Sequence, residues 1–366
     1  MEFKEIKVAE LVEFVNSEFY NSLSVKPISK QRAYSQSRNP NASPDDIALI
    51  VALNNENEVV GYSGILPDSI SCETPKKAFW NSCWWINKTK GNGVAMKLFY
   101  KTLLHCNKNM VYSELTETTS KIVETMKIAY TPYKLNFYRF FLKSNFQFWL
   151  PKKNNFFVHI KFLLKILDFF VNFCLNSLQF IFKKNFNEIS YQFENINYID
   201  SEVVEFLKLH TKSFLLNRNK ETLNWFLSSE WIVKSPDAKD INSPKYYFSS
   251  LAKQYDKQAV KIFQNNELKA FLLITCREGE VKIPYSYYSK NDIPLIAKFL
   301  FNYLSQSKAK SISVVNEDFV KIIENSRVNY FFKRTFPKNF ALSNVFPKEC
   351  VFNKTVQDGD GDLVFT

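Results

Sequence analysis

The chain has 366 residues, of which 46% are hydrophobic and 16% aromatic. This composition suffices for two domains of ordinary size with real cores, and it excludes an intrinsically disordered protein. The net charge of +12 is concentrated in the middle, since residues 139–184 hold eight basic residues and one acid, Asp168, which gives +7 of the +12. We therefore expect any polyanionic partner to bind this middle segment.

The cysteines and the N-terminal residues indicate the cellular compartment of the protein. The six cysteines form no CxxC pair and have no histidine at metal-binding spacing, so we expect reduced, mostly buried thiols and no metal. Residues 1–15 are acidic and amphipathic, without the basic and apolar regions of a secretory signal. The sequence thus predicts a cytoplasmic protein.

Hydrophobic periodicity in the first part of the chain predicts a mixed α/β domain over residues 1–150. A helical region is expected first, over Val8 to Phe19. It precedes a hairpin, a third strand, a glycine-containing turn, a helix, a further strand and helix, and an aromatic strand. The predicted ranges are 47–53, 59–66, 79–86, 94–106, 110–115, 119–128 and 134–142.

A basic amphipathic segment, residues 151–190, is expected to join this domain to a second one over residues 191–366. Within it, residues 161–183 carry a polar residue every three or four positions and apolar residues elsewhere, which predicts a helix with a broad apolar face. No 18-residue stretch lacks polar side chains, so a membrane span is not expected. The helix could instead bury its apolar face between the domains, or lie on an anionic membrane surface through residues 152–184.

The second domain is predicted to repeat the order of elements of the first. Helices are expected between 201 and 232, and the later elements at 259–263, 270–275, 280–287, 293–306, 311–315 and 317–325. The acidic stretch Asp358 to Asp362 stops too early for a calcium-binding EF-hand and predicts a tight turn before a last strand, LVFT.

The glycine turn of the first domain carries the chemical signal. Only seven glycines occur in the chain, and two of them lie in KTKGNGVA, residues 88–95. A helix start offers N–H groups without internal partners and a positive dipole end, and glycine allows a phosphate to approach. A P-loop would need GxxxxGK[ST], and a dinucleotide fold would need a third glycine or alanine where Met96 stands.

The order of elements and this turn resemble the GCN5-related N-acetyltransferase (GNAT) family. Its signature is Gln or Arg, two residues, Gly, one residue, then Gly or Ala, and here Lys88 replaces the Gln or Arg. The resemblance implies two tandem GNAT-like domains, of class α/β (α+β), each with a mixed, mostly antiparallel sheet flanked by helices. The second domain lacks the glycine turn, so we expect it to shape the acceptor site.

The resemblance also implies direct transfer of an acyl group, most simply from acetyl-CoA, to a primary amine without a metal. The implied cofactor-binding residues are Trp85, Ile86, Lys88, Lys90, Gly91, Asn92, Gly93, Val94 and Ala95. A backbone N–H near Trp85 or Ile86 would polarise the thioester carbonyl. Glu114 and Glu117 are candidates for the general base, and Tyr130, or else Tyr133 or Tyr138, for the acid that protonates the leaving thiolate.

Two alternatives stay open. The chain also resembles Fem-type aminoacyltransferases, which join two such domains and use charged tRNA, for which the basic middle segment would be suited. The third hypothesis is a non-catalytic module on the same fold that binds a membrane surface or an anion. No sequence motif identifies the acceptor, because acceptor sites in this kind of fold are built from variable loops. An amino sugar, a lipid-linked saccharide or a peptide amine would each be compatible.

Overall fold

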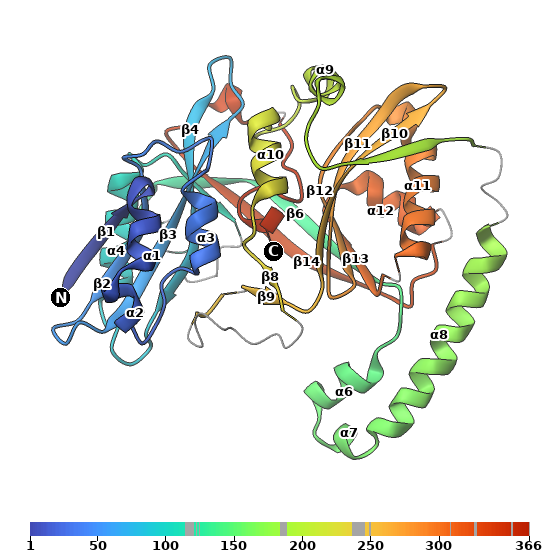
Figure 1. Ribbon diagram of the computed structural model, residues 1–366, viewed down its shortest axis with the longest axis horizontal. Coiled ribbons are helices and arrows are strands. Elements are labelled where there is room, and N and C mark those ends of the chain that lie inside the picture. The colour runs from blue at the N-terminus through green and yellow to red at the C-terminus, as the bar shows by residue number, and fades with distance from the viewer. Residues whose placement is uncertain are drawn as a thin grey trace. The chain divides into compact units, whose positions relative to one another are not determined.

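The computed structural model describes residues 1–113, 121, 123, 125–183, 189–235, 246–248, 250–307, 309–325, 328–352 and 354–365. The chain forms two compact units, each assembled from separate stretches of sequence (Figure 1). Unit 1 comprises Met1–Leu135, Asn197–Tyr255 and Lys338–Thr366, and unit 2 comprises Asn136–Ile196 and Asp256–Pro337. The sequence pattern instead predicts domains that are each contiguous in the chain, with boundaries near residues 150 and 190.

The sheet of unit 1 has the strand order β1-β2-β3-β4-β5-β14. Neighbouring strands are antiparallel except β4 and β5, which are parallel. The strands are β1 (Glu2–Lys7), β2 (Ile47–Leu53), β3 (Val59–Ile70), β4 (Lys76–Ile86), β5 (Met110–Ser113) and β14 (Phe332–Ser343), of which residues 340–342 pair with β5.

The sheet of unit 2 repeats this arrangement in the order β7-β10-β11-β12-β13-β6. Here β12 and β13 form the parallel pair, and β6 pairs with β13 in antiparallel register through residues 138–141. The strands are β6 (Ala129–Phe141), β7 (Gln192–Ile196), β10 (Tyr255–Gln264), β11 (Glu267–Arg277), β12 (Glu280–Tyr288) and β13 (Ser311–Val314).

The last strand of each sheet comes from the other half of the sequence. In the chain, β6 follows β5, yet it completes the sheet of unit 2, and β14 follows β13, yet it completes the sheet of unit 1. This exchange of strands explains why both units are discontinuous in sequence.

Helices cover both faces of the unit 1 sheet, which is why the strand IALIVAL is apolar throughout. Leu49, Val51 and Leu53 of β2 belong to the core shared with α1, whereas Ile50 and Ala52 belong to the core shared with α4. The helices of unit 1 are α1 (Leu11–Asn16), α2 (Glu18–Ser22), α3 (Lys30–Gln36), α4 (Val94–His105), α9 (Ser201–His210) and α10 (Lys220–Ser228). Short elements complete it: η1 (Val8–Glu10), β8 (Val233–Lys234), β9 (Leu251–Ala252), η4 (Lys348–Cys350) and η5 (Leu363–Phe365).

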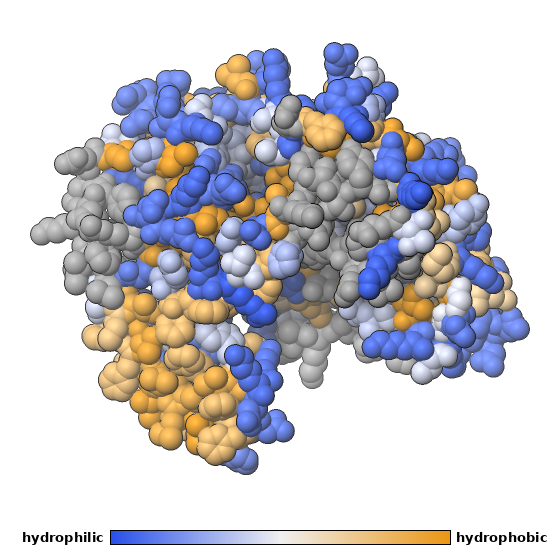
Figure 2. Space-filling model, turned by 180° about the vertical axis from the view of Figure 1, so that it is seen from behind, coloured by the Kyte–Doolittle hydropathy of each residue, from blue (hydrophilic) through white to orange (hydrophobic). Residues whose placement is uncertain are grey.

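In unit 2, three helices lie between β6 and β7: α6 (Phe146–Lys153), α7 (Phe156–His159) and α8 (Lys161–Lys183). Among the described residues, no helix is long and apolar enough to cross a membrane. The apolar side chains of α8 are largely exposed and form a continuous patch (Figure 2). The interpretation in which this helix buries its apolar face therefore does not hold for these residues.

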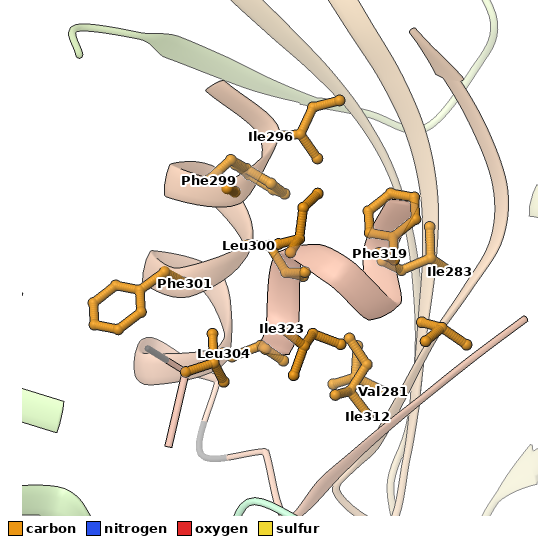
Figure 3. Close-up of a cluster of buried hydrophobic side chains, with 14 of the residues drawn as sticks. Val281, Ile283, Ile296, Phe299, Leu300, Phe301, Leu304, Ile312, Phe319 and Ile323 are labelled. Carbon is orange, nitrogen blue, oxygen red and sulfur yellow. The ribbon is translucent and has the colours of Figure 1, made fainter. Parts of the chain in front are cut away.

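The core of unit 2 lies between its sheet and the helices α11 (Ile293–Gln306) and α12 (Glu317–Asn325), which follow the short η3 (Lys290–Asp292). Figure 3 shows Phe319 and Ile323 of α12 directed toward Ile283 and Val281 of the sheet. The spacing of four residues between Phe319 and Ile323 places both on one helix face, as the sequence pattern predicts.

Several local predictions are wrong. Residues 2–7 form a strand, and the helical region expected over Val8 to Phe19 is divided, because Ser17 is extended and its hydroxyl accepts the N–H of Tyr20 at 3.1 Å. Residues 363–365 form a 3-10 turn instead of a last strand.

The helix expected at 119–128 falls largely outside the described residues and stays a prediction.

Two of the cysteines are not reduced thiols. Cys72 and Cys350 form a disulfide, with their Cα atoms 5.0 Å apart and a sequence separation of 278. Both belong to unit 1, and the bond links its first segment to its last. Sequence spacing could not reveal this pair, because only the return of the chain after β14 brings the two residues together.

One buried arginine joins all three segments of unit 1. Arg218 is 1% exposed, and its guanidinium donates to Asp68 at 2.7 Å and to Asp360 at 3.0 Å. Asp68 also accepts the indole N–H of Trp80 at 2.8 Å. Asp68, Arg218 and Asp360 come from the first, second and third segments respectively, so this one cation fixes their relative positions.

We expect Arg218→Met to destabilise the protein strongly, by about 3–5 kcal/mol, because it leaves two buried carboxylates without their cation. Urea unfolding followed by tryptophan fluorescence measures this. The matched control is Lys208→Ala, which breaks an exposed ion pair with Glu205 and should change the stability little. Equal effects of the two substitutions would show that the buried network does not stabilise unit 1.

Asp360 should make the stability fall as the pH rises. Burial raises the pKa of its carboxyl to about 6; the Arg218 guanidinium opposes this rise, and the Asp68 carboxylate adds to it. A carboxyl whose pKa is raised on folding stabilises at low pH, and this contribution is lost between its ordinary value of 3.8 and about 6. The native chain should therefore lose stability relative to Asp360→Asn across that range in urea titrations, because the amide does not ionise. If the difference in unfolding free energy between the two chains does not change with pH, the raised pKa of Asp360 is contradicted.

Candidate active site

The parallel strands β4 and β5 separate within unit 1. They pair at Phe79 with Met110 and at Trp80 with Val111. Both strands continue beyond these positions, to Ile86 and Ser113, but no further pair joins them within the described part of the chain. From about residue 81 onward, the backbone edge of β4 that faces β5 therefore has no strand partner among the described residues.

A β-bulge lies in β4 where the separation begins. The register between β3 and β4 shifts between Tyr62 and Gly64, and Cys83 has a φ of 55°. Gly64 is required opposite the bulge, because a Cβ there would lie 2.5 Å from the carbonyl oxygen of Ser82. The bulge bends the strand and changes the direction of the residues that follow it.

A buried polar cluster holds this bulge, and the sequence analysis missed it. Arg32 of α3 is 5% exposed, donates to Ser82 at 2.7 Å and contacts the thiol of Cys83. Its guanidinium also lies 4.1 Å from the ring of Trp231 and 3.9 Å from a carboxylate oxygen of Asp362. Burial raises the pKa of the Cys83 thiol, so we assign Cys83 a structural role at the bulge.

Asn87 shapes the turn between β4 and α4. Its N–H donates to Val60 at 2.9 Å, and its side-chain oxygen accepts the N–H groups of Thr89 and Lys90, each at 3.0 Å. Its carbonyl accepts the N–H of Gly91 at 2.9 Å. This local network holds the turn in one conformation, as an Asn side chain does in Asx-turns.

The two glycines of the turn have different roles. A Cβ at Gly91 would lie 2.5 Å from the carbonyl oxygen of Asn87 and 2.5 Å from Ile86, so Gly91 is needed for the packing of the turn. Gly93 has a φ of 71°, and no atom lies within 4 Å of where its Cβ would be. Only Gly93 therefore offers open space for an incoming group.

The N–H groups that remain available lie at the start of α4. The N–H of Val94, which the sequence analysis counted among the donors, is already bonded to the carbonyl of Gly91 at 3.1 Å. Among the described residues, the N–H groups of Asn92, Gly93 and Ala95 have no acceptor. These donors lie at the positive end of a 12-residue helix, which is a suitable site for an anion.

The lysines beside the turn differ in their surroundings. Lys90 forms an ion pair with Glu58 at 2.5 Å, so part of its charge is neutralised. Lys88 and Lys97 are exposed near the same helix start. Positive charge is thus present at the turn, but Lys90 contributes less of it than the sequence analysis expected.

Trp85 and Ile86 occupy the end of β4, and their backbone groups face opposite ways. The N–H groups alternate along a strand, and that of Asn87 donates to Val60 on β3. The N–H of Ile86 therefore faces the β5 edge, and that of Trp85 faces β3. The Trp85 ring stacks between Tyr62, at 5.4 Å, and Tyr247, at 4.8 Å, which gives it a packing role.

The candidate acid and base residues are not placed. Glu114 and Glu117 lie outside the described residues. The backbone of Tyr130 belongs to β6, but its side chain is also outside the described part. Among the described residues, no group of three or more His, Cys, Asp or Glu side chains could hold a metal ion.

Unit 2 has no equivalent of the glycine turn. After β12 the chain forms η3, and α11 begins at Ile293 with a proline in its first turn. A pocket of about 680 Å³ exists elsewhere in this unit, lined partly by Phe141, Trp149, Arg277 and Lys310. It contains none of the residues predicted for the site.

No family model and no curated protein sequence matches the chain. The fold is similar to that of N-myristoyltransferase from Saccharomyces cerevisiae solved with bound myristoyl-CoA, with 11% identity, 94% of this chain and 78% of that chain covered, and a TM-score of 0.50. A GCN5-related N-acetyltransferase from Anabaena variabilis gives 11% identity, 93% and 72% coverage, and a TM-score of 0.47. The likeness to N-myristoyltransferase shows that the chain has the acyl-CoA N-acyltransferase fold, which confirms the predicted fold class.

Proposed function

We propose that this protein is an N-acyltransferase that takes an acyl group from acyl-CoA, most simply acetyl-CoA, and transfers it to a primary amine. The observation that carries the proposal is the start of α4. There, the N–H groups of Asn92, Gly93 and Ala95, which have no acceptor among the described residues, lie close to the open space at Gly93. They directly follow a strand that separates from its parallel neighbour. Such a helix start suits a pyrophosphate, and the open edge of β4 suits an extended amide-containing arm.

In this proposal the Ile86 N–H, which faces the β5 edge, polarises the thioester carbonyl and stabilises the oxyanion that forms on attack. The neutral amine attacks the carbonyl carbon, the C–S bond breaks, and the thiolate leaves with a proton. Glu114 or Glu117 would accept the proton of the amine, and Tyr130 would donate one to the thiolate. Unit 2, without a glycine turn, would contribute to recognition of the acceptor.

Gly93→Asn tests the cofactor site. Asparagine tolerates a positive φ better than other side chains, so the turn should persist while its side chain fills the open space. We expect acetyl-CoA to raise the melting temperature of the native chain and to lose most of this effect with the variant. The matched control is Gly279→Asn, at a φ of 86° in the β11–β12 hairpin, which should bind normally.

The same assay includes myristoyl-CoA and tRNA. Stabilisation by myristoyl-CoA alone would keep the proposal and change the acyl chain. Stabilisation by tRNA but by no acyl-CoA would replace it with the Fem-type function. The proposal fails if the native chain responds to no acyl-CoA.

Glu114→Gln should lower turnover by about 10²- to 10⁴-fold if Glu114 is the general base, because the amine then attacks without proton acceptance. Release of the CoA thiol across a panel of primary amines measures this, with Glu117→Gln as the neighbouring comparison. The acidic limb of the pH–rate profile should disappear in the variant that removes the base. Unchanged profiles in both variants would exclude these two carboxylates.

A further inference from the structure

The helices α6 to α8 of unit 2 expose an unusual amount of apolar surface. On α8, Phe162 is 73%, Phe169 67% and Phe173 63% exposed. We call the exposed apolar side chains of α7 and α8 the aromatic face, and Figure 2 shows them as one continuous patch. Its members are Phe156, Val158, Phe162, Leu163, Ile166, Leu167, Phe169, Phe170 and Phe173. Exposed patches of this extent mark interaction surfaces.

The polar residues of α8 hold this face outward. Asp168 is 4% exposed, and its carboxylate accepts the N–H groups of Phe146 and Gln147 at the start of α6, at 2.7 and 3.0 Å. Asn172 accepts the N–H of Ser144 at 2.8 Å and donates to its carbonyl at 3.1 Å. Two polar residues of the stripe, Asp168 and Asn172, thus face the protein and leave the apolar side chains outside, which reverses the usual orientation of an amphipathic surface helix. Lys161, Lys165 and Asn176 of the same stripe are exposed.

Cations accompany the aromatic face. Lys152, Lys153, Lys161 and Lys165 are exposed on the same helices, and Lys152 lies 3.8 Å above the ring of the half-exposed Phe148. The one acid of the segment, Asp168, is buried. The exposed surface of this segment therefore combines phenylalanine and lysine with no carboxylate.

We propose that the aromatic face docks on an anionic lipid bilayer, with its phenylalanines in the boundary between headgroups and acyl chains and the lysines at the level of the phosphates. A bilayer satisfies both parts of the surface at once. A second copy of the chain would cover the phenylalanines but would bring lysines of equal charge together. The inference does not depend on the proposed acyltransferase function.

Sedimentation of the full-length chain with phosphatidylcholine vesicles, with and without phosphatidylglycerol, tests the proposal. We expect binding to the anionic vesicles that weakens as salt is added. The triple variant Phe162→Ser, Phe169→Ser, Phe173→Ser should lose about tenfold or more in partitioning, because each ring leaves the boundary region. Replacing Lys152, Lys153, Lys161 and Lys165 with glutamate should abolish the preference for phosphatidylglycerol.

The matched control is Leu209→Ser, which removes an apolar side chain that is 77% exposed on α9 of unit 1 and should leave vesicle binding unchanged. Urea unfolding of each variant checks that it folds, which is expected because the replaced side chains are exposed. The proposal is overturned if the native chain does not bind anionic vesicles at modest salt, or if the phenylalanine variant binds as well as the native chain. It is also overturned if the native chain is a dimer that the phenylalanine variant dissociates, since a second copy then covers the face.

Discussion

The sharing of Arg218 between Asp68 and Asp360 is the interaction on which the rest of unit 1 depends. A buried cation with two carboxylates must be placed accurately, because any one of the three left alone would cost several kcal/mol. Since Asp68 also accepts the indole N–H of Trp80, the network reaches the last residue at which β4 still pairs with β5. The geometry of the candidate site therefore depends on Arg218, which belongs to the second segment of unit 1, Asn197–Tyr255.

Local patterns predicted most elements, whereas the connections between distant segments could not be predicted. The continuous apolar run in 47–53 and the helical period in 293–306 are properties of neighbouring residues, and the structure confirms both elements. The exchange of β6 and β14 and the bond between Cys72 and Cys350 depend on contacts far apart in sequence. No pattern within one segment contains that information, so the sequence predicts domains that are each contiguous in the chain.

The candidate site shows the same division. The spacing of KTKGNG predicts an anion site at a helix start, which stays a prediction. At that helix start, the N–H groups of Asn92, Gly93 and Ala95 have no acceptor within the part of the chain that the structure describes. The sequence could not distinguish a glycine needed for packing, Gly91, from one that leaves open space, Gly93, because this depends on how close Ile86 and the Asn87 carbonyl lie. The role of Cys83 was equally hidden, since nothing in FWNSCWWI shows that Arg32 lies against it.

The orientation of α8 also depends on contacts between residues far apart in sequence. Its period predicted a polar stripe and a broad apolar face, and hydrophobicity alone would turn the apolar face inward. Asp168 and Asn172 of the stripe turn inward instead, because Asp168 caps α6 and Asn172 bonds to both backbone groups of Ser144. A buried carboxylate that accepts two helix N–H groups outweighs the orientation that side-chain hydropathy prefers. The surface that the chain presents to its surroundings is thus decided by hydrogen bonds to a neighbouring loop and not by the composition of the helix.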